Sequence, residues 1–120
     1  MKIVITAEGP NMESRVDPRF GRAQYFLLVD SESGSFTAHD NAQNLNAAQG
    51  AGIQAAQNVV RLGAEAVLTG NVGPKAFATL QAGKVAIYTS TAGTVREALE
   101  QWRSGSLQPA GKATVQGHWS

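Results

Sequence analysis

Short apolar runs in the first forty residues predict three β-strands. Residues 3–7 and 25–29 are almost uniformly apolar, which is typical of strands that are covered on both faces of a sheet. In residues 35–40 apolar and polar side chains alternate, so this segment is expected to be a half-covered edge strand. Ser33-Gly34 stands between the second and third runs and predicts a hairpin turn.

From residue 50 onward the apolar residues recur three and four positions apart, which is the spacing of helices. The pattern predicts three helices and two further strands: helices over residues 53–63, 74–82 and 94–102, and strands at residues 66–69 and 85–88. Pro74 suits the first position of the second helix. Thr94 to Glu97 is a capping box that opens the third helix.

The predicted order of elements is βββαβαβα, which places the chain in the α/β class. The first three strands are expected to pair antiparallel, and the later alternation requires right-handed crossovers between parallel strands. We therefore expect a five-stranded mixed sheet with helices on both faces. Residues 1–107 form the single predicted domain, and residues 108–120 are expected to be a flexible C-terminal tail.

Composition excludes several classes of function. The 120 residues contain no cysteine, so disulfides, thiolate zinc sites and cysteine-ligated iron–sulfur clusters are excluded. A formal net charge of +1 argues against a nucleic-acid groove. No stretch approaches the roughly 18 apolar residues that span a bilayer, and the first residues do not resemble a secretion signal. We expect a cytoplasmic protein with neither nucleic-acid nor membrane partners.

Small residues precede all three predicted helices, at Gly50-Ala51-Gly52, residues 70–74 and residues 92–94. Two of these segments follow parallel strands directly, so both should lie at the carboxyl edge of the sheet, where open α/β sheets bind ligands. Helix N-termini offer unpaired N–H groups and a partial positive charge, which suit an anion. The alternative is that the glycines serve only to make tight turns.

A long polar loop, residues 8–22, separates the first two strands. It carries three arginines, Arg15, Arg19 and Arg22. The guanidinium group is a weakly hydrated fork of donors, which suits large and polarisable anions. Loops of this length are often functional. The alternative is a solvated loop in which Asp17 and Glu13 offset the arginine charges.

Direct metal ligands are scarce in this sequence. His39 and His118 are the only histidines, and two distant histidines lack the ligand spacing of a metal site. His39 fits a surface residue of the edge strand, with contact to a ligand as the alternative. Met12 offers a soft thioether within the loop. We retain His39 and Met12 as candidate metal ligands.

The sequence does not predict catalysis. Ser14, Ser90 and Thr91 have no histidine that the topology places beside them. The first strand carries no acidic residue to hold a catalytic magnesium ion. We expect a binding protein rather than an enzyme. A hydrolase of a phosphorylated small molecule is the last-placed alternative, because glycine-rich helix starts also suit phosphate.

An ordered series of motifs resembles one known family. The motifs are Arg15-Val16, Arg19 to Ala23, Tyr25 to Asp30, Asn41, Gly50 to Ile53, Thr69 to Ala76, Gly93 to Ala98 and Gly105 to Leu107. In this order they resemble the dinitrogenase iron–molybdenum cofactor biosynthesis family over residues 1–107. Many relatives place a histidine where this chain has Gln49, so a histidine ligand is not expected at that point.

The resemblance implies a ribonuclease H-like fold and binding of a molybdenum-containing metal–sulfur cluster or its precursor. The family includes nitrogenase cofactor carriers and the orange proteins, which hold a molybdenum–copper sulfide cluster. As a predicted single domain, the chain is similar to the orange proteins in architecture, and copper is accordingly a candidate component of the cluster. A protein partner in cluster delivery is also implied.

A thiomolybdate-type cluster brings its own sulfide and a net negative charge. Our hypothesis is that backbone N–H groups, cations and apolar contacts hold it without a protein–metal bond. The expected contacts are Arg15, Arg22, Asn71, Gly73 and Lys75, with Gly50 and Gly52 lining the pocket. The rival interpretation is a ligand-free protein–protein adaptor in an anaerobic metabolic or cell-division assembly.

Overall fold

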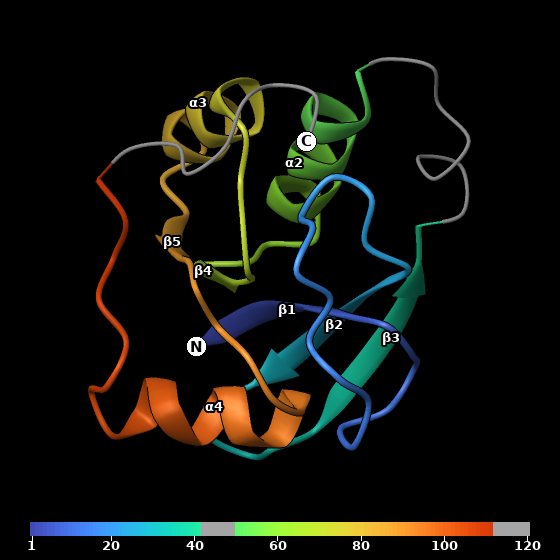
Figure 1. Cartoon of the computed structure of the whole chain (residues 1–120), viewed down its shortest axis with the longest axis vertical. Coiled ribbons are helices and arrows are strands. Elements are labelled where there is room, and N and C mark those ends of the chain that lie inside the picture. The colour runs from blue at the N-terminus through green and yellow to red at the C-terminus, as the bar shows by residue number, and fades with distance from the viewer. Residues whose placement is uncertain (42–49, 112–120) are drawn as a thin grey trace.

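The computed structural model describes residues 1–41 and 50–111 (Figure 1). Its elements follow the predicted order: β1 (Lys2–Ala7), β2 (Tyr25–Asp30), β3 (Phe36–Asp40), α2 (Ala51–Arg61), β4 (Ala66–Leu68), α3 (Pro74–Ala82), β5 (Ala86–Tyr88) and α4 (Val95–Arg103). None of the helices in these residues is long and apolar enough to cross a membrane.

The strands form one five-stranded sheet in the order β3-β2-β1-β4-β5. β2 pairs antiparallel with β1 and β3, whereas β4 pairs parallel with β1 and β5. At the centre of the sheet, Ile5 of β1 lies opposite Leu27 of β2 and Leu68 of β4. The predicted mixed sheet is therefore confirmed.

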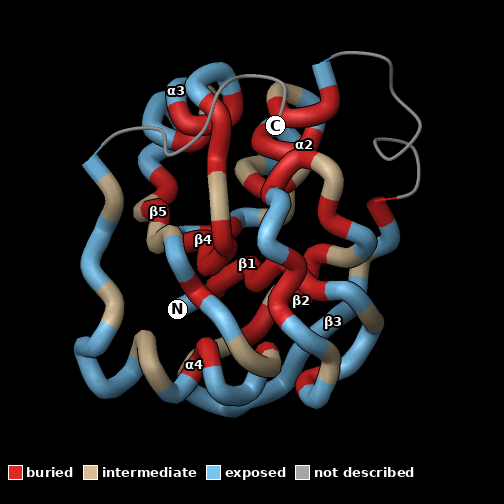
Figure 2. Tube along the Cα trace, in the orientation of Figure 1, coloured by how far each residue is buried: buried red, intermediate tan, exposed pale blue. Residues whose placement is uncertain are grey.

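Helices cover both faces of this sheet, as predicted: α2 and α3 lie side by side on one face and α4 lies on the other (Figure 1). Successive residues of β1 serve the two faces, because Val4 packs with α2 and α3 while Ile3 and Ile5 pack with α4. β1 is buried along nearly its whole length (Figure 2).

Local sequence signals account for the ends of the helices. After α2, Gly63 adopts a φ of 82°, a left-handed conformation that glycine takes at little cost. Pro74 is the first residue of α3. Before α4, the Thr94 side chain accepts a hydrogen bond from the Glu97 N–H and the Glu97 side chain accepts one from the Thr94 N–H, which is the predicted capping box.

The two edge strands of the sheet, β5 and β3, differ in how far other residues cover them. Pro109 forms an antiparallel bridge with Tyr88 of β5, and the Ala110 N–H donates to the Ile87 carbonyl at 2.7 Å. At the other edge β3 is mostly exposed, with Phe36 38% exposed (Figure 2). The prediction that this segment is an edge strand is confirmed. The prediction that one face of the strand is covered was wrong, because the core beneath α4 ends at β2.

The boundary predicted at residue 108 stays a prediction. Residues 108–110 lie along β5, as just described, and Ala110 also packs against the α2 and α3 side of the core. The rest of the predicted tail from residue 112 lies outside the described residues, and so do His118 and Gln49.

Candidate functional site at the carboxyl edge of the sheet

One end of the sheet gathers strand ends and helix starts from across the chain, and we call it the carboxyl edge because the parallel strands β1, β4 and β5 end there. Since β2 and β3 run antiparallel to their neighbours, the start of β2 and the end of β3 lie at the same edge: Tyr25 is opposite both Ala7 and Asp40. α3 and α4 begin just after β4 and β5, so both start here. α2 also starts here, because it leads into the opposite end of β4.

The start of α4 is already filled by the chain itself. Its first two N–H groups, from Val95 and Arg96, donate to the carbonyls of Ser14 and Met12 at 2.8 and 2.9 Å. The third, from Glu97, donates to Thr94 Oγ1 at 3.1 Å. The expectation that this helix start is open to an anion was therefore wrong, because the loop between β1 and β2 supplies its acceptors.

The starts of α2 and α3 differ from that of α4. Within the described residues, the N–H groups of Ala51 and Gly52 in α2 and of Lys75 and Ala76 in α3 have no hydrogen-bond partner. The two helices run in the same direction, because both cross from the carboxyl edge to the opposite edge of the sheet. Their positive ends therefore lie at the same edge and on the same face (Figure 1).

The polar loop of residues 8–22, which we call the arginine loop, crosses this edge and is bound to it. The Asp17 N–H donates to the Thr6 carbonyl at 2.9 Å, and the Asn71 N–H donates to the Pro18 carbonyl at 2.8 Å. Gly70 allows this approach, since a Cβ there would lie 2.6 Å from both Pro18 Cα and the Pro18 carbonyl oxygen.

The arginine loop carries its two candidate arginines to different sides of the sheet. Arg15 is exposed and lies opposite Thr94, beside the start of α4. Arg22 is half-buried and follows Phe20, which packs beneath α2 and α3. Arg15 therefore lies beside α4, whereas the backbone on either side of Arg22, at Phe20 and Ala23, packs on the α2 and α3 side of the core.

The remaining predicted contacts lie at those two helix starts. Gly73 is the buried cap residue of α3, Lys75 is exposed in its first turn, and Gly50 and Gly52 are the cap and second residues of α2. Asn71 has a structural role as well, because its Nδ2 donates to the Pro18 carbonyl at 3.4 Å.

One important residue was misjudged from the sequence. Asp17 is only 2% exposed, and its two carboxylate oxygens accept hydrogen bonds from the Arg19 and Gln24 N–H groups at 3.1 and 3.2 Å. It is thus a buried anchor of the loop, and because its Oδ1 also lies 3.8 Å from Arg19 Nε it offsets one loop arginine without being solvated. Glu13 is paired with Arg96 of α4 rather than with a loop arginine. The signal in the sequence was an aspartate just before Pro18, a common start of a turn.

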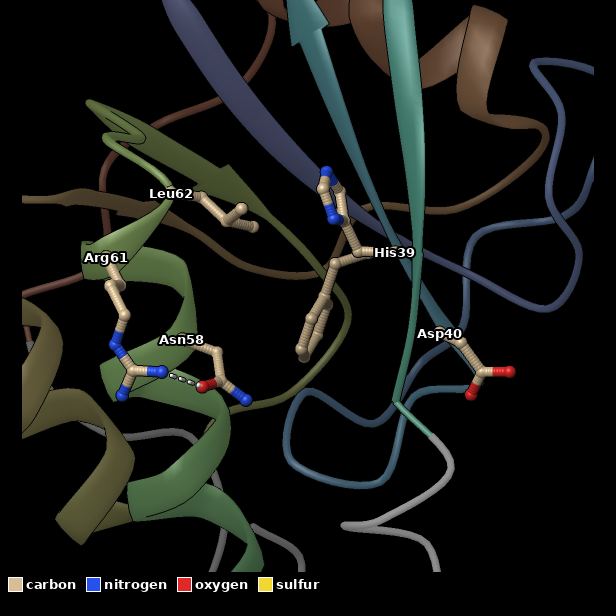
Figure 3. A pocket seen from close by; sticks show the side chains of 6 residues that line it. His39, Asp40, Asn58, Arg61 and Leu62 are labelled. Atoms are coloured by element: carbon tan, nitrogen blue, oxygen red, sulfur yellow. Dashed lines mark hydrogen bonds between the residues drawn. The ribbon is translucent and has the colours of Figure 1, made fainter.

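The two candidate metal ligands lie apart from the helix starts. His39 lines a hollow of about 240 Å³ beside the last turn of α2, together with Asn58, Arg61 and Leu62 (Figure 3). Its Nε2 is 2.8 Å from Thr37 Oγ1. Met12 is 6% exposed in the core beneath α4, so packing accounts for it. No group of three His, Asp or Glu that could hold a metal ion occurs within residues 1–41 and 50–111.

The capping box at the start of α4 also shifts the pKa of Glu97. Hydrogen bonds from the Thr94 backbone N–H and, to a lesser extent, from the Thr94 side chain hold the pKa of Glu97 below its ordinary value of 4.5, and Arg15 adds a smaller attraction. Each of these groups favours the ionised carboxylate, which is the form that caps α4.

We expect the stabilising effect of Glu97 to disappear in acid. Because its pKa is lower in the folded than in the unfolded state, its contribution is complete above about pH 4.5 and is lost as the pH falls through the folded-state pKa. Urea unfolding of the wild type and Glu97→Gln across this range should show a stability gap that closes toward low pH. A gap of constant size would contradict the capping role.

Comparison with known proteins decides the family. The family model described as "Dinitrogenase iron-molybdenum cofactor" matches residues 1–105. The chain belongs to this family. The resemblance found in its motifs is thereby confirmed, and the matched segment includes the arginine loop and all three helix starts.

Several solved structures are similar to this chain over almost its whole length. The apo form of the orange protein from Desulfovibrio gigas is 40% identical, with a TM-score of 0.93 over 95% of this chain and 96% of that chain. A putative NifB protein from Thermotoga is 35% identical, with a TM-score of 0.83 over 97% and 98%. A putative dinitrogenase from Methanocaldococcus jannaschii, 16% identical with a TM-score of 0.67 over 93% and 96%, shares the fold alone.

Proposed function

We propose that this protein binds and carries a molybdenum-containing metal–sulfur cluster without a covalent or coordinate bond to it. The observation that carries the proposal is the pair of helix starts, α2 and α3, at one edge of the sheet and on one face, whose first N–H groups have no partner among the described residues. Family membership and the similarity to an orange protein point to a cofactor-related cargo.

The chemistry of the side chains fits an anionic cargo better than a bare metal ion. The chain has no cysteine, and its described residues gather no set of three metal-binding side chains. A cluster that supplies its own sulfide needs positive charge and N–H donors instead. Lys75, Arg22 and the helix starts provide these. We leave His39, Met12 and Arg15 out of the proposed site, because His39 lines the hollow beside the last turn of α2, Met12 packs beneath α4 and Arg15 lies opposite Thr94.

The proposed cargo is a thiomolybdate-type cluster, with copper as a second metal. Anaerobic titration of the metal-free protein with tetrathiomolybdate and copper(I), followed by desalting, tests it. We expect a coloured species to stay with the protein at a fixed ratio of molybdenum to copper. Complete separation of colour and metal from the protein would overturn the proposal.

Reversal of the charge at Lys75 should weaken retention of the cluster by about five-fold, because a cation in the first turn of α3 is replaced by an anion next to an anionic cargo. Absorption titration of Lys75→Glu under anaerobic conditions measures the effect. The matched control is Lys84→Glu, because Lys84 is also exposed but follows the other end of α3. Equal losses in the two variants would show that only net charge matters.

A ligand-free adaptor remains the second candidate, and the exposed edge of β3 is the observation that favours it. Such an edge offers unpaired backbone groups to a partner strand. Protein that is colourless after anaerobic, metal-replete purification would support the adaptor.

With the carrier function we also propose a non-catalytic role, a cytoplasmic location, a protein partner that receives the cluster and a ribonuclease H-like classification of the fold.

A further inference from the structure

A buried carboxylate closes the turn that carries Arg22. We call residues 18–24 the Arg22 turn. Both of its ends are hydrogen-bonded to the Asp17 carboxylate: Oδ1 accepts from the Arg19 N–H at 3.1 Å and Oδ2 accepts from the Gln24 N–H at 3.2 Å. Asp17 is 2% exposed. A buried carboxylate is tolerated only where donors surround it, so these two hydrogen bonds are strongly favoured in the folded chain.

The backbone of Asp17 is fixed in turn to the centre of the sheet. Its N–H donates to the Thr6 carbonyl at 2.9 Å, and its own carbonyl accepts from the Thr6 hydroxyl at 2.8 Å. The Thr6 hydroxyl also lies 2.8 Å from the hydroxyl of Thr69, just after β4. Asp17 therefore holds both ends of the Arg22 turn in a fixed position relative to β1 and β4.

The middle of the turn is held from the other side. The Phe20 N–H donates to the Asn71 carbonyl at 3.2 Å. Asn41 Nδ2 donates to the carbonyls of Gly21 and Ala23 at 3.2 and 2.8 Å. The residues on both sides of Arg22 are thus anchored, and the half-buried Arg22 side chain leaves the turn from a fixed backbone position.

We propose that Asp17 is a positioning residue for the cluster, acting through Arg22 and not by touching the cargo. This inference rests on the proposed function and deepens it. A cation whose backbone is fixed in advance loses less conformational freedom on binding, so affinity depends on the residue that fixes it. The carboxylate is needed for its two acceptor oxygens, since the side-chain amide introduced by Asp17→Asn would place a donor where one N–H now donates.

The test combines substitutions of Asp17 and Arg22. In the tetrathiomolybdate and copper(I) titration, Asp17→Asn should weaken retention of the cluster about 10-fold. In an Arg22→Gln background the same change should weaken it by less than about two-fold, because the residue through which it acts is gone. The matched control is Glu13→Gln, which removes an exposed carboxylate of the same loop and should leave retention unchanged.

Amide hydrogen exchange supplies a readout that does not need the cargo. Asp17→Asn should raise exchange at whichever of the Arg19 and Gln24 amides faces the introduced NH2 group, while amides of β1 and α3 remain protected. Asp17→Ser, which keeps one acceptor for Arg19, should release Gln24 alone. Unchanged retention in Asp17→Asn, or equal losses with and without Arg22, would overturn the inference, and so would global unfolding of both variants. Loss of colour from the wild type would instead overturn the proposed function.

Discussion

Replacing Phe20 by alanine is expected to lower the free energy of unfolding by about 3–5 kcal/mol, the usual range for deletion of a buried aromatic ring. Phe20 is fully buried, and its ring centroid lies 5.7 Å from that of Phe26 at an interplanar angle of 29°. It comes from the arginine loop but packs on the α2 and α3 side of the core. The cavity would therefore open directly beneath the Arg22 turn.

The chain offers a matched control for this change. Phe36 on β3 is 38% exposed and belongs to neither side of the core, so Phe36→Ala should cost less than about 1 kcal/mol. Urea denaturation of both variants measures the difference. Phe20→Ala should also lose retention of the cluster under conditions in which it is still folded. Similar stability losses at Phe20 and Phe36 would show that the arginine loop is not part of the core.

The sequence predicted the elements of the fold well because each has a local cause. Pro74 and the capping box of Thr94 and Glu97 start their helices through contacts within four residues, and such contacts are visible in the sequence. The apolar run of β1 likewise implied cover on both faces. The strand ends differ from the prediction by one residue, which is the usual uncertainty of element boundaries.

The exposure of β3 had no local cause. Alternation in residues 35–40 predicts that one face is covered, but whether it is covered depends on the place of α4, whose apolar face packs with β1, β2, β4 and β5 and leaves β3 uncovered. In the same way, the start of α4 is filled by carbonyls from Met12 and Ser14, about eighty positions away in the chain. Neither arrangement follows from periodicity or spacing.

The candidate site shows the same division. The helix starts at Gly50 and Gly73 followed from the alternation of strands and helices, and the structure places both at the carboxyl edge. The arginines did not follow, because a loop that crosses an edge carries neighbouring residues to opposite faces. Arg15 lies opposite Thr94 at the start of α4, yet Phe20, five positions later, packs on the α2 and α3 side of the core. The role of Asp17 was likewise ambiguous in the sequence, because only its burial in the folded chain shows that it anchors the loop.

The smallest substitution with a large expected effect is Gly70→Ala. The added Cβ would lie 2.6 Å from Pro18 Cα and 2.6 Å from the Pro18 carbonyl oxygen, and these are backbone atoms that no side-chain rotation can move. The same carbonyl accepts the Asn71 N–H at 2.8 Å, so the arginine loop would have to leave the β4–α3 connection. We expect a loss of about 2–3 kcal/mol in the free energy of unfolding, near the upper end for overpacking.

Gly111→Ala is the matched control, because a Cβ at Gly111 meets nothing within 4 Å. Urea denaturation should separate the two variants, and limited proteolysis should cut Gly70→Ala within the arginine loop well before the wild type is cut. Retention of the cluster should fall when the loop detaches, since the Arg22 turn keeps its place only while the loop is bound to Thr6 and Asn71. Normal retention in a variant whose loop is cleaved would mean that the helix starts hold the cargo without Arg22.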